Sequence, residues 1–131
     1  LEPLVRSRQN TAPHTALLLL LALVISAAAA MPVKHMVWFK FKEETAPEKL
    51  EAVKAGLMAL KGKAALGIVD ISFGPTFKHD RSGGHTHALC VDLKDKEALE
   101  VYAADPDHVA VITDHIKPNL GAPPMAMDYE Y

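Results

Sequence analysis

The sequence has little cysteine, few aromatic residues and no large excess of charge of either sign. Its single cysteine cannot form an internal disulfide, which excludes a disulfide-stabilised scaffold and a cysteine-based zinc finger. The 14 basic and 16 acidic residues give a formal net charge of −2. This balance argues against nucleic acid as a partner, because nucleic-acid-binding domains usually carry a strong basic excess. The length of 131 residues leaves room for one ordinary domain.

The hydrophobic fraction of 50% is at the top of the range for globular proteins, and it has a local cause. Residues 1–30 hold 18 of the hydrophobic residues, ten of them in the unbroken run Ala16–Ile25. Arg6 and Arg8 precede this run, and small residues follow it. The layout is typical of a secretory signal or targeting peptide. The run is shorter than the ~20 residues that a membrane-spanning helix needs.

Three interpretations of residues 1–30 stay open. A cleaved signal peptide would make the mature protein secreted or organelle-targeted, with no membrane span in the mature chain. A translation start at Met31 would make residues 1–30 a mistranslated upstream segment and the protein cytoplasmic. A retained membrane anchor is the third interpretation. All three place the folded domain at residues 31–131, where 15 acidic and 12 basic residues give a net charge of −3.

The first half of this domain carries clear periodic patterns. Alternation over residues 33–42 predicts a strand with one apolar face. The residues on that face are Val33, His35, Val37, Phe39 and Phe41. Thr45 followed by Glu48 indicates a capping box, and apolar residues at helical spacing predict a helix over 46–61. Strands are predicted over 67–74 and 85–93, with a polar, glycine-rich loop between them.

The second half completes a recognisable order of elements. Asp95 and Asp105 are predicted to cap two further helices, the second with proline at its first position. A last strand is predicted over 124–131. The resulting order, β-α-β-β-α-β, is that of an α+β protein with a ferredoxin-like fold, in which the helices cover one face of a four-stranded antiparallel sheet.

The uncovered face of such a sheet needs a partner. In this chain it carries Met36 and Trp38 on the first strand and Cys90 on the third. The simplest cover is a second copy packed by the same face, so we expect a homodimer.

Four short motifs are spread over residues 33–130. They are Val33–His35 leading into Phe39–Lys42, Thr86–Ala88, Tyr102 followed by Asp105–Val109, and Asp128–Tyr129. Taken together, they resemble the stress-responsive A/B barrel family, the dimeric α+β barrel or Dabb domain. The resemblance implies a homodimer whose two sheets form an α/β barrel. It also implies a pocket between the helices and the sheet of each protomer.

The resemblance also implies a possible active site. One plant branch of the family, similar to olivetolic acid cyclase, cyclises polyketides. In that branch the positions that match Tyr102 and His108 carry the chemistry, and those that match His35 and His87 line the pocket. The ligand-binding residues that we expect on this basis are His35, Val37, Phe39, His87 and Leu89.

The residue types fit chemistry that needs no cofactor. A neutral imidazole at His108 can remove a proton next to a carbonyl group, and the Tyr102 hydroxyl can hydrogen-bond the resulting oxyanion. The positive end of the predicted helix favours neutral His108, whereas Asp105 and Asp107 favour the charged form, and the sequence leaves that balance open. Three functions remain: binding of a small hydrophobic molecule, a cyclase or isomerase, and self-association without a ligand.

Two histidines of the third predicted strand are candidate metal ligands. His85 and His87 alternate on one strand, so both imidazoles share one face. Zinc requires at least three protein ligands, and the spacing identifies no third ligand. We therefore predict neither a metal ion nor a cofactor.

Overall fold

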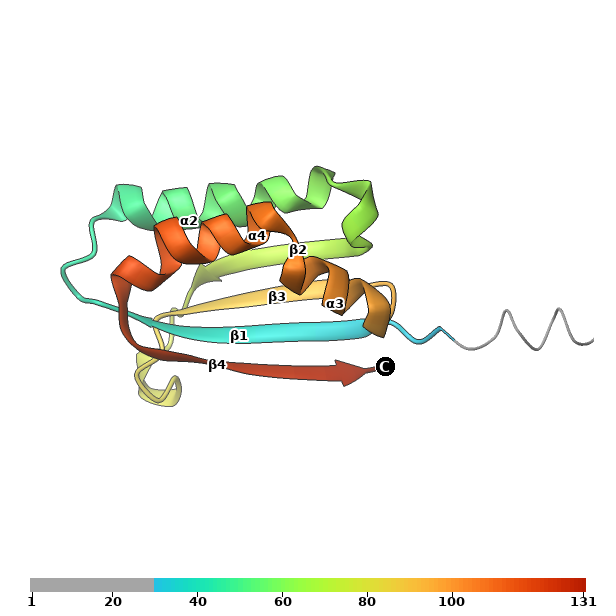
Figure 1. Cartoon of the computed structure of the whole chain (residues 1–131). Coiled ribbons are helices and arrows are strands. Elements are labelled where there is room, and N and C mark those ends of the chain that lie inside the picture. Colours follow the sequence, from blue (N-terminus) through green and yellow to red (C-terminus); the bar gives the residue numbers. More distant parts are fainter. Residues whose placement is uncertain (1–29) are drawn as a thin grey trace, which may run out of the picture. The chain divides into compact units, whose positions relative to one another are not determined.

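The computed structural model describes residues 30–131, and the predicted signal or targeting peptide lies outside these residues except for Ala30. The described strands are β1 (Val33–Phe41), β2 (Ile68–Pro75), β3 (His87–Leu93) and β4 (Leu120–Glu130). They form one antiparallel sheet in the order β2-β3-β1-β4. The helices α2 (Pro47–Ala59), α3 (Lys96–Ala104) and α4 (Pro106–Val111) lie on one side of this sheet (Figure 1). The predicted α+β order is confirmed.

The alternation in β1 sorts its side chains between two environments. Val33, Val37 and Phe39 face the helices and are buried. The buried cluster continues onto β3 with Leu89 and Val91, which pair with β1 in an unbroken register. Period-two alternation therefore placed the core face correctly, because successive side chains of a strand point to opposite faces.

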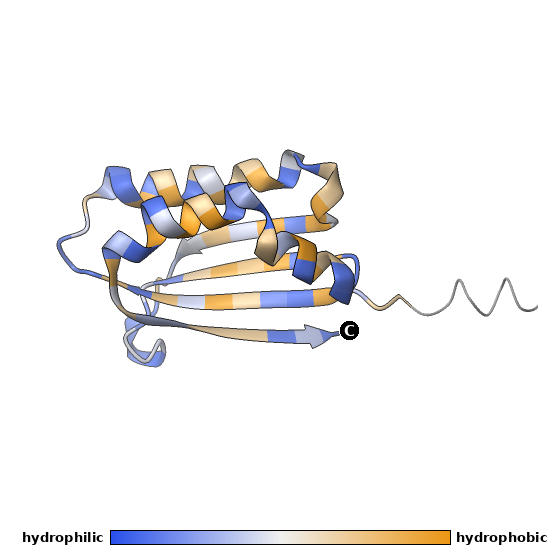
Figure 2. Ribbon diagram, viewed as in Figure 1, coloured by the Kyte–Doolittle hydropathy of each residue, from blue (hydrophilic) through white to orange (hydrophobic). Residues whose placement is uncertain are grey.

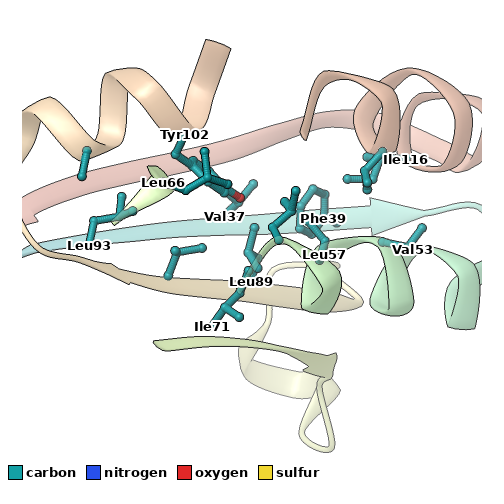
Figure 3. Packing of buried hydrophobic residues seen from close by; sticks show 14 of the residues in the cluster. Val37, Phe39, Val53, Leu57, Leu66, Ile71, Leu89, Leu93, Tyr102 and Ile116 are labelled. Carbon is teal, nitrogen blue, oxygen red and sulfur yellow. The ribbon is translucent and has the colours of Figure 1, made fainter. Parts of the chain in front are cut away.

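The helices cover the buried face of the sheet and complete the core. Figure 3 shows Leu57 of α2 and Tyr102 of α3 pointing toward Val37 and Phe39 of the sheet. Hydrophobic residues recur along α2 and α4 between polar ones (Figure 2), as amphipathic helices on a sheet require. None of the helices in the described part of the chain is long and apolar enough to cross a membrane.

Helix capping follows the sequence at two of the three predicted starts. The Asp95 carboxylate accepts a hydrogen bond from the Ala98 amide at 2.8 Å, as an N-cap should. The capping box at Thr45 is wrong. Helix α2 begins at Pro47 with Ala46 as its N-cap and without a side-chain cap. The Thr45 hydroxyl is buried and has no hydrogen-bond partner within residues 30–131. Proline at the first position already removes one of the amide donors that a cap would serve.

Strand β4 begins earlier than predicted. It starts at Leu120 rather than at residue 124, and it includes Pro123 and Pro124. Proline cannot donate to a neighbouring strand, so it is tolerated only at an edge. Because β4 pairs with β1 alone among the described strands, it is an edge strand of this sheet and the two prolines interrupt no second ladder there.

Gly56 allows α2 and α4 to pack closely. An added Cβ at this position would lie 2.7 Å from Cγ2 of Val111, a buried residue of α4. We expect Gly56→Ala to lower the free energy of unfolding by about 1 kcal/mol. Overpacking costs about 1–3 kcal/mol, and alanine returns about 1 kcal/mol of helix propensity. Denaturant unfolding would measure the difference.

The chain offers a matched control for this prediction. A Cβ added at Gly62 meets nothing within 4 Å, so Gly62→Ala should leave stability nearly unchanged. The double variant Gly56→Ala/Val111→Ala should show a favourable coupling, because the second change removes the methyl group that the first one meets. A Gly56→Ala protein as stable as the parent would contradict this account of the contact.

No helix of residues 30–131 covers the opposite face of the sheet. This face carries Met36 and Trp38 from β1, with Met127 and Met125 beside them on β4. Cys90 lies next to Met36 on β3, as predicted. We call these five residues and Tyr129 the open face. Met125 and Met127 are each 57% exposed and Tyr129 is 45% exposed, an unusual concentration of large apolar side chains in water.

Candidate functional site

Three of the predicted site residues come together beneath α3 and α4. The ring of Tyr102 on α3 lies 4.1 Å, centroid to centroid, from the ring of His108 on α4. The ring of His35 on β1 meets Tyr102 edge-on at 5.7 Å. Three elements that are distant in the sequence thus deliver one hydroxyl and two imidazoles to one place.

Asp105 fixes His108 at this position. Its Oδ1 accepts hydrogen bonds from the backbone amides of Asp107 and His108, which makes it the N-cap of α4. Its other oxygen accepts from Lys63 at 2.6 Å. The Lys63 ammonium holds the pKa of Asp105 below its usual value, so the cap stays ionised. Lys63 also binds Asp107 at 2.6 Å and ties the start of α4 to the segment after α2.

His108 is buried, and its protonation is set chiefly by that burial. Desolvation lowers its pKa, and nearby His35 acts in the same direction. The Ala103 carbonyl and Asp105 act in the opposite direction but are weaker in sum. The His108 imidazole is therefore neutral, a point that the sequence alone left open. Because Nδ1 lies 3.3 Å from the Ala103 carbonyl oxygen, Nδ1 donates to it and the lone pair is on Nε2.

The Tyr102 hydroxyl is the most unusual group of the site. Tyr102 is 0% exposed, and its hydroxyl has no hydrogen-bond partner among the described residues. Burial raises the pKa of Tyr102, so the phenol is protonated and available as a donor. Buried polar groups are almost always paired, and an orphan of this kind calls for an explanation.

Asp128 is a member of the site that sequence reasoning missed. Its carboxylate accepts from Nδ1 of His35 at 2.5 Å. The two residues are directly opposed in the register of β1 and β4. Asp128 belongs to a recognised motif, but its role depends on that register, which the sequence alone does not supply.

His87 lies apart from this cluster. It is stacked on Phe73 at 5.3 Å, and its Nδ1 is 3.0 Å from the Thr86 hydroxyl. His35 pairs with Val91, four residues along β3 from His87, which is a distance of about 13 Å along the strand. Of the other expected ligand-binding residues, Val37 and Leu89 lie between the two histidines, and Phe39 lies opposite His87. All three are buried in the core.

Residues 30–131 form, among others, two pockets that are not lined by Tyr102 or His108. One, of about 410 Å³, is formed by β1, α3 and β4 and is lined by Asp128 and Leu99 among others. The other, of about 780 Å³, lies at the loop between β2 and β3. The residues that the structure describes contain no group of three or more histidine, cysteine or acidic side chains able to hold a metal ion.

The pH dependence of stability tests the burial of His108. Its pKa is lower in the folded state than the ordinary value of ~6.5, so the unfolded chain binds a proton more readily. The free energy of unfolding should therefore be highest at pH values above the ordinary pKa, and it should decrease as the pH falls below it. The melting temperature should decline between about pH 7 and about pH 5, and less steeply in His108→Gln.

Burial also lowers the pKa of His87, so part of this slope should remain in His108→Gln and disappear in His87→Gln/His108→Gln. Exposed His79→Gln is the matched control and should keep the parent slope. An unchanged slope in the double variant would show that neither buried histidine is responsible.

The sheet order and the one-sided helices define the class of protein: a ferredoxin-like α+β domain, with a histidine–tyrosine cluster between helices and sheet. Residues 33–131 match the family model of the stress responsive A/B barrel domain. The chain belongs to this family.

Similar proteins agree with this assignment. A stress-response A/B barrel domain-containing protein of Arabidopsis thaliana is 33% identical over 86 residues, which are 66% of this chain and 32% of that protein. The chain thus spans about a third of the relative. A crystal structure of another Arabidopsis thaliana protein is 27% identical, with a TM-score of 0.64 over 76% of this chain and 94% of that one. A dimeric ferredoxin-like protein of unknown function from Thermobifida fusca is 23% identical, with a TM-score of 0.67 over 79% and 93%.

Proposed function

We propose that the protein is a homodimer joined through the open face, and that each subunit binds a small apolar molecule with one hydrogen-bonding group at Tyr102. The dimer is supported by the exposed methionines of the open face and by the dimeric structure from Thermobifida fusca. A stable protein interface buries about 1,200–2,000 Å², and a whole face of a small sheet is the kind of surface that supplies such an area.

The main support for ligand binding is the Tyr102 hydroxyl, which has no hydrogen-bond partner among the described residues. Leaving a buried donor unsatisfied costs about 1–3 kcal/mol, which a ligand oxygen placed beside it would offset. The surroundings are apolar, so the rest of the ligand should be hydrocarbon. Val37, Phe39 and Leu89 extend from His35 toward His87 over about 13 Å, which suits an elongated molecule.

The pocket formed by β1, α3 and β4 is where we expect a ligand to enter, because a chain of contacts leads from it to Tyr102. Asp128 lines that pocket and binds His35, and His35 contacts Tyr102. Helix α4 continues beyond His108 as a π-helical turn at Ile112–Ile116. Such turns are rare and occur frequently at functional sites.

The binding experiment uses 2-nonanone, a nine-carbon ketone, with nonane as the hydrocarbon control. Calorimetry on the purified protein should give a tighter dissociation constant for the ketone, by about 2- to 13-fold, the worth of one hydrogen bond. Tyr102→Phe should remove this preference. The exposed Tyr131→Phe removes an equal hydroxyl elsewhere and should keep this preference. Equal affinities for ketone and hydrocarbon in the parent would overturn the proposal.

The second candidate function is proton abstraction next to a carbonyl group, and the state of His108 favours it. The pKa of His108 is lowered, so the imidazole is neutral at pH 7, and its free Nε2 can accept a proton. The Cα–H bond of a bound ketone would break, with its proton moving to Nε2 and its electron pair forming the enolate. Tyr102 would hydrogen-bond the enolate oxygen. Cyclisation or isomerisation can follow from that enolate.

Hydrogen–deuterium exchange tests this step without knowledge of the natural substrate. In deuterated water, NMR should show the protein catalysing exchange at the carbons that flank the carbonyl of 2-nonanone. His108→Ala should abolish that catalysis, whereas His115→Ala, on the same helical segment, should retain it. If 2-nonanone binds but exchanges no faster than in buffer, the ligand-binding function stands and the catalytic one is wrong.

A further inference from the structure

The loop between β2 and β3 forms a second candidate site, at the end of the sheet where His87 lies. A pocket of about 780 Å³ opens here, within the size range of small-molecule sites. Trp38 and Met125 of the open face form part of its lining, and Phe77 of the loop forms another part. Phe77 is 97% exposed, so its ring has little cover from the subunit itself.

The same pocket is lined by two cations. Lys78 and Arg81 both belong to the loop, and neither forms an ion pair within residues 30–131. The Lys40 ammonium lies close by, 3.4 Å from the position that a Cβ on Gly84 would take. Asp80 is the one acidic residue of the loop, and it is exposed and not part of the lining. The pocket therefore combines apolar walls with uncompensated positive charge.

Hydrogen bonds hold the loop in this shape. The Thr76 amide donates to the Thr86 carbonyl at 2.8 Å, and the Thr76 hydroxyl accepts from the Lys78 amide at 3.1 Å. The amide and Nδ1 of His85 both donate to the Ser82 carbonyl, at 3.0 and 2.9 Å. A loop organised in this way loses little conformational entropy when it binds a ligand.

We propose that this pocket binds an organic anion with an apolar body, such as a carboxylate on a hydrocarbon chain. The carboxylate would pair with Arg81, whose planar guanidinium can donate two parallel hydrogen bonds, and with Lys78. The hydrocarbon would lie against Trp38 and cover the exposed Phe77 ring. The site is separate from the Tyr102 cluster and does not depend on the function proposed for that cluster.

The single tryptophan of the chain, Trp38, is a built-in reporter for the test. Titration with decanoate should change its fluorescence and saturate. The uncharged control, decanol, has the same chain length and should bind at least about tenfold more weakly, the factor equivalent to one charge-assisted hydrogen bond. Lys78→Gln/Arg81→Gln should weaken decanoate by a similar factor and leave decanol unchanged.

Two further variants make the result decisive. Lys49→Gln/Lys54→Gln removes the same charge from exposed positions of α2 and should bind decanoate as the parent does. Tyr102→Phe should also bind decanoate as the parent does, because it alters only the Tyr102 cluster. Equal affinities of the parent protein for decanoate and decanol would overturn the proposal. It would also be overturned if Lys49→Gln/Lys54→Gln weakened decanoate binding as much as Lys78→Gln/Arg81→Gln does. Failure of decanoate to bind the dimer would also overturn it, because the partner would then fill the pocket.

Discussion

Tyr102→Phe should raise the free energy of unfolding by about 1–3 kcal/mol, although it removes a residue of the candidate site. The hydroxyl is buried without a partner, so its desolvation is a penalty that the phenylalanine side chain does not carry. The ring itself is retained, with its contacts to His35 and His108. A gain of about 1 kcal/mol corresponds to a rise of about 4–8 °C in the melting temperature of a domain of this size.

Thermal and denaturant unfolding of the ligand-free protein would measure this gain. Tyr131→Phe is the control, because the Tyr131 side chain is 54% exposed and its hydroxyl makes only a long contact of 3.4 Å with Asp92 within residues 30–131. Stabilisation by Tyr102→Phe together with loss of ketone preference would identify the hydroxyl as a group kept for function rather than for stability. A destabilised Tyr102→Phe protein would instead assign the hydroxyl a hidden structural partner, such as an ordered water molecule.

Met127→Glu should separate the dimer into monomers. Met127 lies on the open face beside Met36, so in the proposed interface its side chain would be buried by the partner, and the twofold symmetry would bury two new carboxylates. Each unpaired buried charge carries a penalty of several kcal/mol. We expect the dissociation constant of the dimer to rise by at least about a hundredfold, or about 2.7 kcal/mol.

Light scattering and sedimentation over a range of protein concentrations would measure the change. Val109→Glu is the matched control, because Val109 is a similarly exposed apolar residue that lies on helix α4, away from the open face. It should leave the dimer intact. If Met127→Glu stays dimeric while Val109→Glu dissociates, the helices and not the sheet form the interface.

The candidate site shows where reasoning from the sequence reaches its limit. Tyr102 and His108 are six positions apart and belong to adjacent, well-capped helices, so their proximity follows from local structure and was predictable. His35 joins them only because β1 runs beneath α3. Asp128 joins them only through the pairing of β1 with β4, and a slip of one residue would point it to the other face.

The separation of His87 from the cluster has the same physical origin. Alternation correctly places His35 and His87 on the helix-facing side of the sheet, but it carries no information on position along the strands. That position depends on the antiparallel register, in which His35 meets Val91 and His87 meets Phe39. Residues that share a face can therefore lie far apart.

By itself, the sequence determined the order of the elements, the buried face of β1 and of β3, the caps at Asp95 and Asp105, and the family. These properties are local or periodic, and short-range sterics and hydrogen bonding set them. Tertiary structure alone decided that His108 is neutral, that the Tyr102 hydroxyl has no partner, that Gly56 is a packing contact and that Thr45 caps nothing. Each of these depends on which atoms from distant segments surround a group, because burial and close contact are properties of the folded chain.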